Sequence, residues 1–316
     1  MKTVLSKVGA AARDFWLRPA APDALAFLRI VVAAIALLQL AQLWPHLLEL
    51  YGNSGFIQWV ILETGTPGWV PSVAKLALVL NAYGVRAATT VYWVFGVYGV
   101  ALTGLLLGYR TRLSAGVAWL AHALTTNSGY MSLYGVDTML HVLFVYLFAF
   151  PCNGRWSLDA RAGRVVPTPA LWRIGMRTVQ LHLCIIYLNT GLGKAVGEQW
   201  WNGEAIWRAV MQPQFASFDM SWLAQVPWVP RVAGWGTLLV EVGYGVAIWF
   251  RPLRQPWLWA TISLHLGIAV FMRLWLFSLT MIVFNIAAFA WTEGRIVPAR
   301  VPEREPEAVE PAAVGA

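Results

Sequence analysis

Residues 24–44 read ALAFLRIVVAAIALLQLAQLW, a run that is apolar apart from Arg29 and two glutamines. A helix needs about 20 mostly apolar residues to cross the hydrocarbon core of a bilayer, so this run predicts a transmembrane helix. The whole chain agrees, because 59% of its 316 residues are hydrophobic and only 12% are charged, whereas typical soluble domains carry about 25% charge. The composition therefore excludes an ordinary soluble domain and a disordered chain.

Seven further apolar runs extend the pattern to a bundle. They are residues 87–108, 113–130, 136–151, 174–194, 232–250, 257–272 and 274–291. We predict an all-α, polytopic transmembrane helical bundle of about eight spans. One span more or fewer stays open, because 257–291 is interrupted only at Arg273. Two stretches do not fit a span: we expect 56–83 to be interfacial or re-entrant, and the Trp- and Pro-rich 195–231 to lie on the surface or cap a cavity.

The distribution of positive charge predicts the orientation. With a cytoplasmic N-terminus, 16 of the 23 Lys and Arg residues fall on cytoplasmic segments, six fall outside, and Arg29 lies within the first span. Cytoplasmic loops are enriched in Lys and Arg, so we expect both termini in the cytoplasm and a bacterial inner membrane as the location. Residues 1–23 are then a cytoplasmic segment, 24–292 the transmembrane domain, and 293–316 a disordered cytoplasmic tail rich in Pro, Glu and Ala.

Several functional classes find no support in the sequence. The net charge of +8 is accounted for by topology, so nucleic acid is not an expected partner, whereas the lipid bilayer is. Cys152 and Cys184 make no disulfide framework, and no His pattern with metal-ligand spacing occurs, so no metal is predicted. The absence of a Walker loop and of GxGxxG disfavours nucleotide-driven transport.

Ionisable side chains inside the spans are functional candidates, because a charge at the centre of a bilayer costs about 3 kcal/mol or more. They are Arg29, Asp137, His141, His182, Lys194, Glu241 and His265. We expect them to line a polar cavity, although a structural role is the alternative for each, such as Glu241 pairing with Arg29. Asp137 and His141 are four residues apart and can touch, either as a proton-relay pair or as a structural contact.

The run 174–194 is the most informative. Helical spacing places one polar or small set on a single face: Arg173, Arg177, Gln180, Cys184, Tyr187, Gly191 and Lys194. The opposite face, with Ile185 and Leu188, suits lipid. Gly191 and Gly193 leave room for a helix or a ligand beside Lys194. Lys194 is either a snorkelling residue at a span end or a cavity lysine, whose shielding from water suits a neutral base.

The run Tyr187-Leu-Asn-Thr-Gly191-Leu-Gly193-Lys194, followed by Trp200 and Gly203-x-Ala205, resembles the horizontally transferred transmembrane (HTTM) domain family. Two other pieces match, Leu133-Tyr134-Gly135-Val136-Asp137 and, after Pro151, Trp156-Ser157-Leu158-Asp159; Glu241 and His265 fit its later part. The resemblance covers roughly residues 20–292, and the combination of these pieces is more specific than any one of them. The superfamily includes the vitamin K-dependent γ-glutamyl carboxylase.

This resemblance implies a chemistry. In the carboxylase, the matching lysine deprotonates vitamin K hydroquinone, oxygen converts the anion into a strong base, and CO₂ adds to the glutamate carbanion which that base generates. Lys194 is implied as the catalytic base on the outer side, with Asp137 and His141 as relay or orienting groups. A reduced isoprenoid quinone of the vitamin K type, O₂ and CO₂ are the implied co-substrates, and a peptide or protein the implied partner. The predicted polar network is Arg29, Asn127, Gln180, His182, Tyr187, Glu241 and His265.

The sequence departs from the carboxylase at two places. The carboxylase has an Asn-His pair before its Tyr-Gly, where this chain reads Asn127-Ser128-Gly129-Tyr130, with His141 one helix-length further on. It also has a large lumenal region that grips its substrates, where this chain has a short tail. We therefore expect quinol activation to be the shared chemistry, and carboxylation stays open. The rival hypothesis is a non-enzymatic membrane protein for peptide-toxin maturation, immunity or transport, in which Lys194 is structural.

Overall fold

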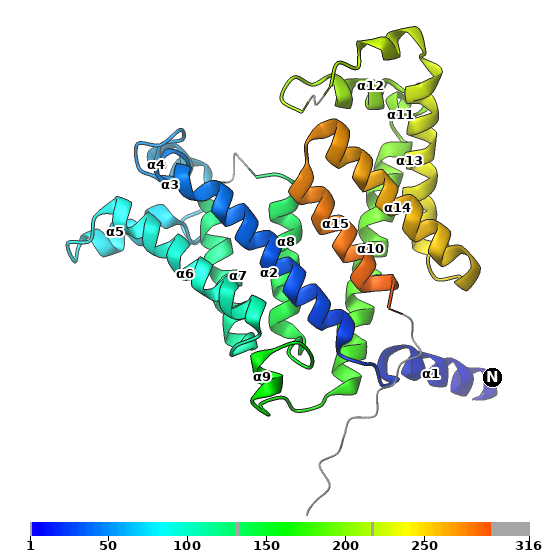
Figure 1. Cartoon of the computed structure of the whole chain (residues 1–316), viewed down its shortest axis with the longest axis horizontal. Helices are drawn as coiled ribbons and strands as arrows, with labels where there is room; N and C mark the ends of the chain where they lie inside the picture. Colours follow the sequence, from blue (N-terminus) through cyan, green and yellow to red (C-terminus); the bar gives the residue numbers. More distant parts are fainter. Residues whose placement is uncertain (1, 130–132, 216–217, 292–316) are drawn as a thin grey trace, which may run out of the picture.

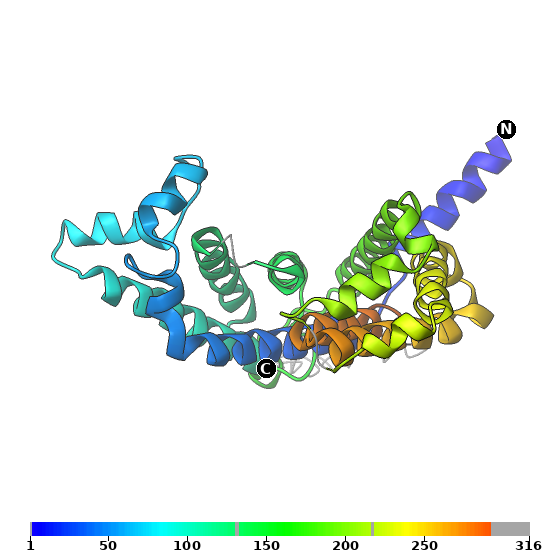
Figure 2. The ribbon, with the colours of Figure 1, turned by 90° about the horizontal axis from the view of Figure 1, so that it is seen from above.

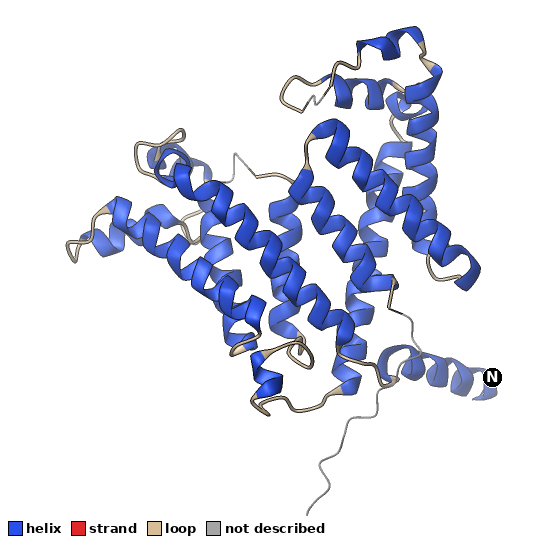
Figure 3. Cartoon of the chain, viewed as in Figure 1, coloured by secondary structure: helices blue, strands red, loops and turns tan. Residues whose placement is uncertain are grey.

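The computed structural model describes residues 2–129, 133–215 and 218–291, and every regular element in these ranges is helical (Figure 3). The longer helices are α1 (Lys2–Leu17), α2 (Asp23–Leu43), α6 (Ala87–Leu107), α7 (Thr111–Ser128), α8 (Gly135–Ala149), α10 (Pro169–Ala195), α13 (Trp228–Ala247), α14 (Arg251–Met272) and α15 (Trp275–Phe289). The short ones are η1 (Trp44–His46), α3 (Leu47–Tyr51), α4 (Trp59–Gly65), α5 (Val73–Asn81), α9 (Leu158–Arg161), α11 (Glu198–Trp201), α12 (Glu204–Met211) and η3 (Ser221–Gln225). The predicted all-α class is confirmed, and the predicted tail lies outside the described residues.

Each predicted apolar run becomes one helix, and local backbone chemistry sets several of the ends. Helix α6 stops at Gly108, whose φ of 67° is left-handed and whose amide caps the carbonyls of the last turn. Helix α10 begins with Pro169 in its first turn, where a missing amide proton costs nothing. Helices α14 and α15 separate at Arg273, whose φ is 57°, at the interruption that the sequence indicated.

The bundle has a mostly apolar interior that also buries several polar side chains, and it exposes many large apolar ones. On α10, Tyr187 is 2% exposed and Gln180 is 9% exposed, whereas Ile185 on the opposite face is 62% exposed. Large apolar side chains are exposed on other helices too, including Val100 on α6 and Leu239 on α13. Extensive exposed apolar surface marks contact with lipid or with another protein. The two faces that the sequence predicted for α10 are therefore present, with the polar one inside.

The membrane-spanning character is carried most clearly by two helical stretches. Residues Asp23–Tyr51 and Ala87–Leu107 are long and apolar enough to cross a bilayer, whereas Gly135–Ala149 and Trp275–Phe289 are apolar but shorter. These helices agree with a membrane protein. The number of eight spans and the cytoplasmic placement of both termini stay predictions.

Helical segments lie at both ends of the bundle (Figure 1). Helix α9 and the start of α2 lie at one end with α1, which extends away from the packed helices (Figure 2). Helices α3, α4, α11 and α12 lie at the opposite end. The stretch 56–83 contains α4 and α5, and 195–231 contains α11, α12 and η3. Both stretches are thus short helices at an end of the bundle.

The segment before residue 24, which was not predicted to be helical, contains α1. Its Phe15 carbonyl accepts hydrogen bonds from Arg173 Nε at 3.0 Å and Arg177 Nε at 3.2 Å. The Arg177 guanidinium also lies over the Phe15 ring, 4.3 Å from its centroid. The arginine end of the polar face on α10 therefore holds α1 against the bundle.

Candidate functional site

Lys194 and Glu241 form a close ion pair between the end of α10 and the middle of α13. Lys194 Nζ lies 2.6 Å from both carboxylate oxygens of Glu241. The side chain of Glu241 is 7% exposed and that of Lys194 is 25% exposed. The Lys194 ammonium also lies 5.2 Å from the ring centroid of Trp200 on α11, a cation–π contact. The lysine is therefore enclosed on two sides and partly open on a third.

A glycine makes this pairing sterically feasible. A Cβ atom on Gly191 would lie 2.8 Å from the Val242 amide nitrogen and 2.9 Å from Glu241 Cβ, so only glycine lets α10 approach α13 this closely. Gly193 differs, because a Cβ there would meet nothing within 4 Å. Of the two glycines singled out in the sequence, only Gly191 is needed for helix packing.

The following segment folds over α13 beside the same lysine. Gly203 has a φ of 91°, and a Cβ there would lie 2.6 Å from the Arg231 amide nitrogen. A Cβ on Gly234 would lie 2.4 Å from the Trp200 carbonyl oxygen. Trp235 Nε1 donates to the Trp201 carbonyl at 2.9 Å. The segments Gly191–Lys194, on α10, and Trp200–Gly203, which follows it, thus both pack against α13.

A chain of buried hydrogen bonds lies inward from the ion pair. Tyr244 Oη donates to Asn285 Oδ1 at 2.7 Å, and Asn285 Nδ2 donates to Tyr187 Oη at 2.8 Å. Tyr187 Oη is in turn 2.7 Å from His265 Nε2. The chain joins α13, α15, α10 and α14, and all four side chains are at most 3% exposed. Two turns of α10 separate Tyr187 from Lys194, so the chain and the ion pair belong to one region, which we call the Lys194 site.

The electrostatics of the Lys194 site suit proton transfer to or from an oxygen. An ammonium held by a carboxylate can stabilise an anion beside it, and the carboxylate can accept a proton. A weakly solvated surrounding strengthens both effects. Cys184 and Asn285 add no further charge. Among the described residues of this region, the charges are those of Lys194 and Glu241, of which the carboxylate is buried and the ammonium partly exposed.

Gln180 lies at the other part of the α10 face. Its Nε2 donates to the Ala288 carbonyl of α15 at 2.6 Å, and its Oε1 accepts from Arg177 at 2.7 Å. His182 points elsewhere, because its Nδ1 is 2.6 Å from Tyr146 Oη on α8. Both residues connect helices, and neither has a contact with Lys194 or Glu241 in the described structure.

Asp137 and His141 do not hydrogen-bond to each other in the described part of the chain, contrary to expectation. Asp137 Oδ2 accepts from the Tyr134 amide at 3.1 Å, which caps the start of α8, and Oδ1 accepts from Gln39 at 2.8 Å. Capping competes with the i,i+4 contact and draws the carboxylate back toward the helix N-terminus. His141 instead accepts from Trp119 Nε1 at 3.1 Å and lies 3.4 Å from His122 Nδ1.

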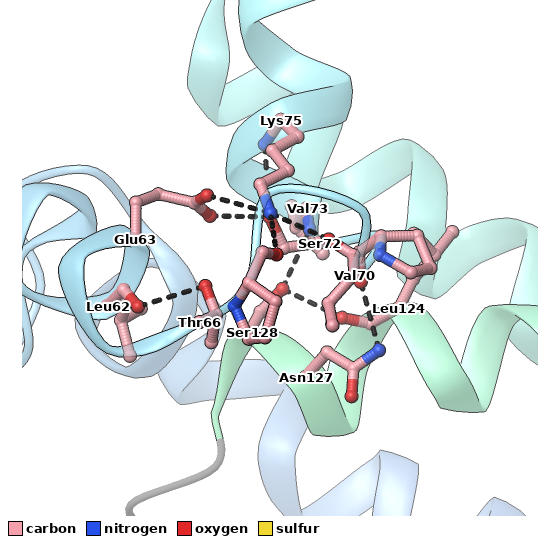
Figure 4. Close-up of polar contacts among 12 residues, drawn as sticks. Leu62, Glu63, Thr66, Val70, Ser72, Val73, Lys75, Leu124, Asn127 and Ser128 are labelled. Atoms are coloured by element: carbon pink, nitrogen blue, oxygen red, sulfur yellow. Dashed lines mark hydrogen bonds and ion pairs between the residues drawn. The ribbon is translucent and has the colours of Figure 1, made fainter.

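His122, which was not among the predicted site residues, is buried and lies on α7 beside the half-buried His141 of α8. It is 2% exposed, and its Nε2 has no hydrogen-bond partner among the described residues. Asn127 lies at the end of α7 and donates to the Pro71 carbonyl at 3.0 Å (Figure 4). It therefore holds the stretch before α5 against α7, and nearby Lys75 of α5 pairs with Glu63 of α4 at 3.2 Å. Asn127 is part of that junction, and within the described residues no hydrogen bond joins it to the Lys194 site.

Arg29 is a structural joint at the opposite end of the bundle, and it does not pair with Glu241. Its side chain is 0% exposed. The guanidinium donates to five backbone carbonyls, those of Leu105, Leu106, Cys152, Arg155 and Trp156. It thereby connects α2 to the end of α6 and to the turn before α9. The expectation of one cavity that holds all the ionisable residues is wrong for Arg29.

Asp159 of the Trp-Ser-Leu-Asp piece has a similar joining role. Its carboxylate accepts hydrogen bonds from the Arg110 and Thr111 amides at 3.0 and 2.9 Å and from Thr111 Oγ1 at 2.7 Å. Burial alone would raise the pKa of Asp159, but these bonds and one from Arg164 outweigh it and hold the pKa below its ordinary value. The motif fixes the turn between α6 and α7 against α9.

A cavity of about 270 Å³ lies at this end too, lined by residues that include Thr111, Phe148, Cys152 and Thr168. It is far along the bundle from Lys194, since α9 and α11 lie at opposite ends (Figure 1). No cluster of three or more His, Cys, Asp or Glu side chains suited to a metal ion occurs within residues 2–129, 133–215 and 218–291. The Lys194 site remains the strongest candidate, because it unites the family-like piece from Tyr187 to Gly203 with an enclosed ion pair and a buried hydrogen-bond chain.

The comparison with known protein families agrees with this arrangement. The HTTM domain family matches residues 17–292, a range that contains Arg29, Asp159, Lys194, Glu241 and His265. No curated protein and no solved structure matches the chain. Because the match spans most of the 316 residues, the chain belongs to the HTTM domain family, whose context is the vitamin K-dependent carboxylase-like superfamily.

Proposed function

We propose that this HTTM protein is a quinol-activating enzyme whose Lys194 accepts a proton from a reduced isoprenoid quinone. The carrying observation is the enclosed Lys194–Glu241 pair beside Trp200, with Lys194 Nζ 2.6 Å from both carboxylate oxygens. The family membership supports the quinol as the substrate class, with O₂ and CO₂ as co-substrates. The location of the protein in a bilayer supports a lipid-soluble substrate that enters from the membrane.

Proton transfer from the substrate involves both Lys194 and Glu241. An ammonium has no lone pair, so Lys194 accepts a proton only after passing one of its own to Glu241. The result is a protonated Glu241 and an ammonium on Lys194, which faces the anion left on the substrate. Direct transfer of the proton to Glu241 leads to the same state. In either order, the Lys194 ammonium stabilises the negative charge that develops on the substrate oxygen. Such electrostatic stabilisation is usually the largest single contribution to catalysis.

We also propose a membrane topology. The protein crosses a bacterial inner membrane eight times, with both termini in the cytoplasm and the Lys194 end of α10 on the outer side. Arg110, Arg155, Arg164 and Arg251 follow α6, α8, α9 and α13 on the α9 side. This arrangement agrees with the enrichment of arginine in cytoplasmic loops.

The test is product formation by the full chain in lipid nanodiscs supplied with menaquinol and oxygen. We expect a quinone epoxide by mass spectrometry from the wild type and a loss of at least a hundredfold in Lys194→Ala. Lys75→Ala is the matched control, since Lys75 also pairs with a glutamate, at 3.2 Å, and is 27% exposed. Equal yields from wild type and Lys194→Ala would refute the role of Lys194. Folded wild type without product would favour the non-enzymatic rival, and co-purified peptides would then be identified.

A further inference from the structure

The hydrogen-bond chain of the Lys194 site has a defined direction. The Met281 carbonyl can only accept, and it lies 2.8 Å from Asn285 Nδ2, so the amide group of Asn285 is oriented with its nitrogen on that side. The second proton of this nitrogen goes to Tyr187 Oη. Asn285 Oδ1 is then left to accept from Tyr244. Every donor of Asn285 has a partner in this orientation.

This direction decides the tautomer of His265. Tyr187 Oη already accepts from Asn285, so its own proton is free to go to His265 Nε2, 2.7 Å away. With Nε2 as the acceptor, a neutral imidazole carries its proton on Nδ1. The opposite tautomer would leave the Tyr187 proton without an acceptor in a buried site, which is the costlier arrangement.

The hydrogen-bond chain therefore ends at His265 Nδ1–H, a buried donor without an acceptor among the described residues. His265 is 3% exposed, and its Nδ1 has no hydrogen-bond partner among the described residues. Phe277 meets the imidazole edge-on, with ring centroids 5.8 Å apart, and offers no acceptor oxygen. Tyr187, the hydrogen-bond partner of His265, lies two turns of α10 before Lys194, so the ion pair belongs to the same region. An unpaired buried donor beside a reactive pair is an incomplete site.

We propose that His265 Nδ1–H is the donor that binds a ligand oxygen in the Lys194 site, namely a carbonyl of a quinone or the matching oxygen of a quinol. This inference rests on the proposed function for the class of ligand, and on the hydrogen-bond chain for the atom that binds it. The chain polarises the donor, because Tyr244, Asn285 and Tyr187 donate in sequence toward His265. We place the Lys194–Glu241 pair beside the same ligand, because Glu241 lies one turn of α13 before Tyr244, the first donor of the hydrogen-bond chain.

Two isosteric variants separate the two nitrogens of the ring. An asparagine amide nitrogen reaches the place of Nδ1, whereas a glutamine side chain reaches the place of Nε2. His265→Gln therefore keeps an acceptor for Tyr187 and removes the ligand donor. His265→Asn restores the donor and leaves the Tyr187 proton unpaired. His46→Gln serves as the matched control, because the side chain of His46 is exposed and pairs with the exposed Glu49.

The experiment measures two quantities for each full-length variant in nanodiscs. One is the Kd of oxidised menaquinone-4, from saturable quenching of tryptophan fluorescence together with the infrared shift of its carbonyl band. The other is the melting temperature. We expect His265→Gln to raise the Kd about five- to tenfold and to lose the carbonyl shift with little change in melting temperature. We expect His265→Asn to melt lower and to recover most of the affinity and the shift.

The contrary outcomes are distinct. If the wild type binds menaquinone-4 and both variants bind equally well, an ordered water satisfies Nδ1 and the inference is wrong. If both variants lose affinity in proportion to their loss of melting temperature, His265 is only structural and the inference is again wrong. If the folded wild type shows no saturable binding, the proposed function itself fails, whatever the variants do.

Discussion

Replacing Lys194 by methionine tests whether the ion pair serves folding or chemistry. The variant leaves Glu241, 7% exposed, without its cation. Unit charges 2.6 Å apart attract by about 6 kcal/mol at an effective dielectric constant of about 20, and desolvation offsets a large part of this. Because the lysine is 25% exposed, we expect Lys194→Met to cost about 3 kcal/mol, at the lower end for a broken buried pair.

The double variant Lys194→Met with Glu241→Leu carries the decisive comparison. Apolar pairs often replace buried ion pairs without loss of stability, or with a gain. If the pair is retained for chemistry, the double variant will be at least as stable as the wild type and inactive. The assay is reversible unfolding in mixed detergent micelles, analysed as a double-mutant cycle; with Lys194→Met costing about 3 kcal/mol and the double variant costing nothing, the expected coupling is at least about 3 kcal/mol. Additive single effects, or a double variant as unstable as Lys194→Met, would refute the reasoning.

Four further predictions follow from other contacts. Gly191→Ala should destabilise the protein by about 1–3 kcal/mol, because the new Cβ would meet the Val242 amide and Glu241; the matched Gly193→Ala should be neutral or slightly stabilising in the same unfolding assay. Arg29→Lys should cost about 2–4 kcal/mol, since three donors cannot satisfy five carbonyls, whereas Arg208→Lys on the exposed surface should change unfolding little. Because the folded pKa of Asp159 is lowered, its ionised form stabilises the fold above about pH 4 and that contribution is lost as pH falls through the folded pKa; Asp159→Asn should therefore destabilise the protein at pH 7 and do so progressively less as the pH falls below about 4. For topology, an impermeant maleimide should label Val196→Cys in intact cells and Val166→Cys only after permeabilisation, both positions being exposed while Cys152 and Cys184 are buried; the reverse pattern would contradict a cytoplasmic α9 end.

Local sequence features predicted the helices well. The apolar runs that became α2 and α6 are long enough to be identified as helices from length and hydrophobicity alone. The left-handed Gly108 and the break at Arg273 lie where apolar runs stop. The two faces of α10 followed from helical periodicity alone. These properties depend on neighbours within a few residues, which is why the sequence carries them.

Partners across helices were harder to predict. The polar face on α10 pointed to Lys194, but its partner is 47 residues away on α13, and which helices pack together is not a local property. Asp137 was expected to contact His141 because of their spacing, but its carboxylate instead caps the N-terminus of α8. Asn285 was missed because it carries no charge. A lone amide within the apolar run 274–291 was the signal that marks such a residue, since an amide in hydrocarbon needs a partner.

Photolabelling is the most direct test of the Lys194 site. A photoreactive menaquinone analogue would be bound to the full chain in nanodiscs, activated by light in the presence and absence of excess menaquinone, and mapped by peptide mass spectrometry. We expect labelling that excess menaquinone suppresses, on the peptide that contains Lys194 and Trp200 and on the part of α13 around Glu241. Suppressible labelling confined to the α9 end, near Cys152 and Thr168, would contradict it.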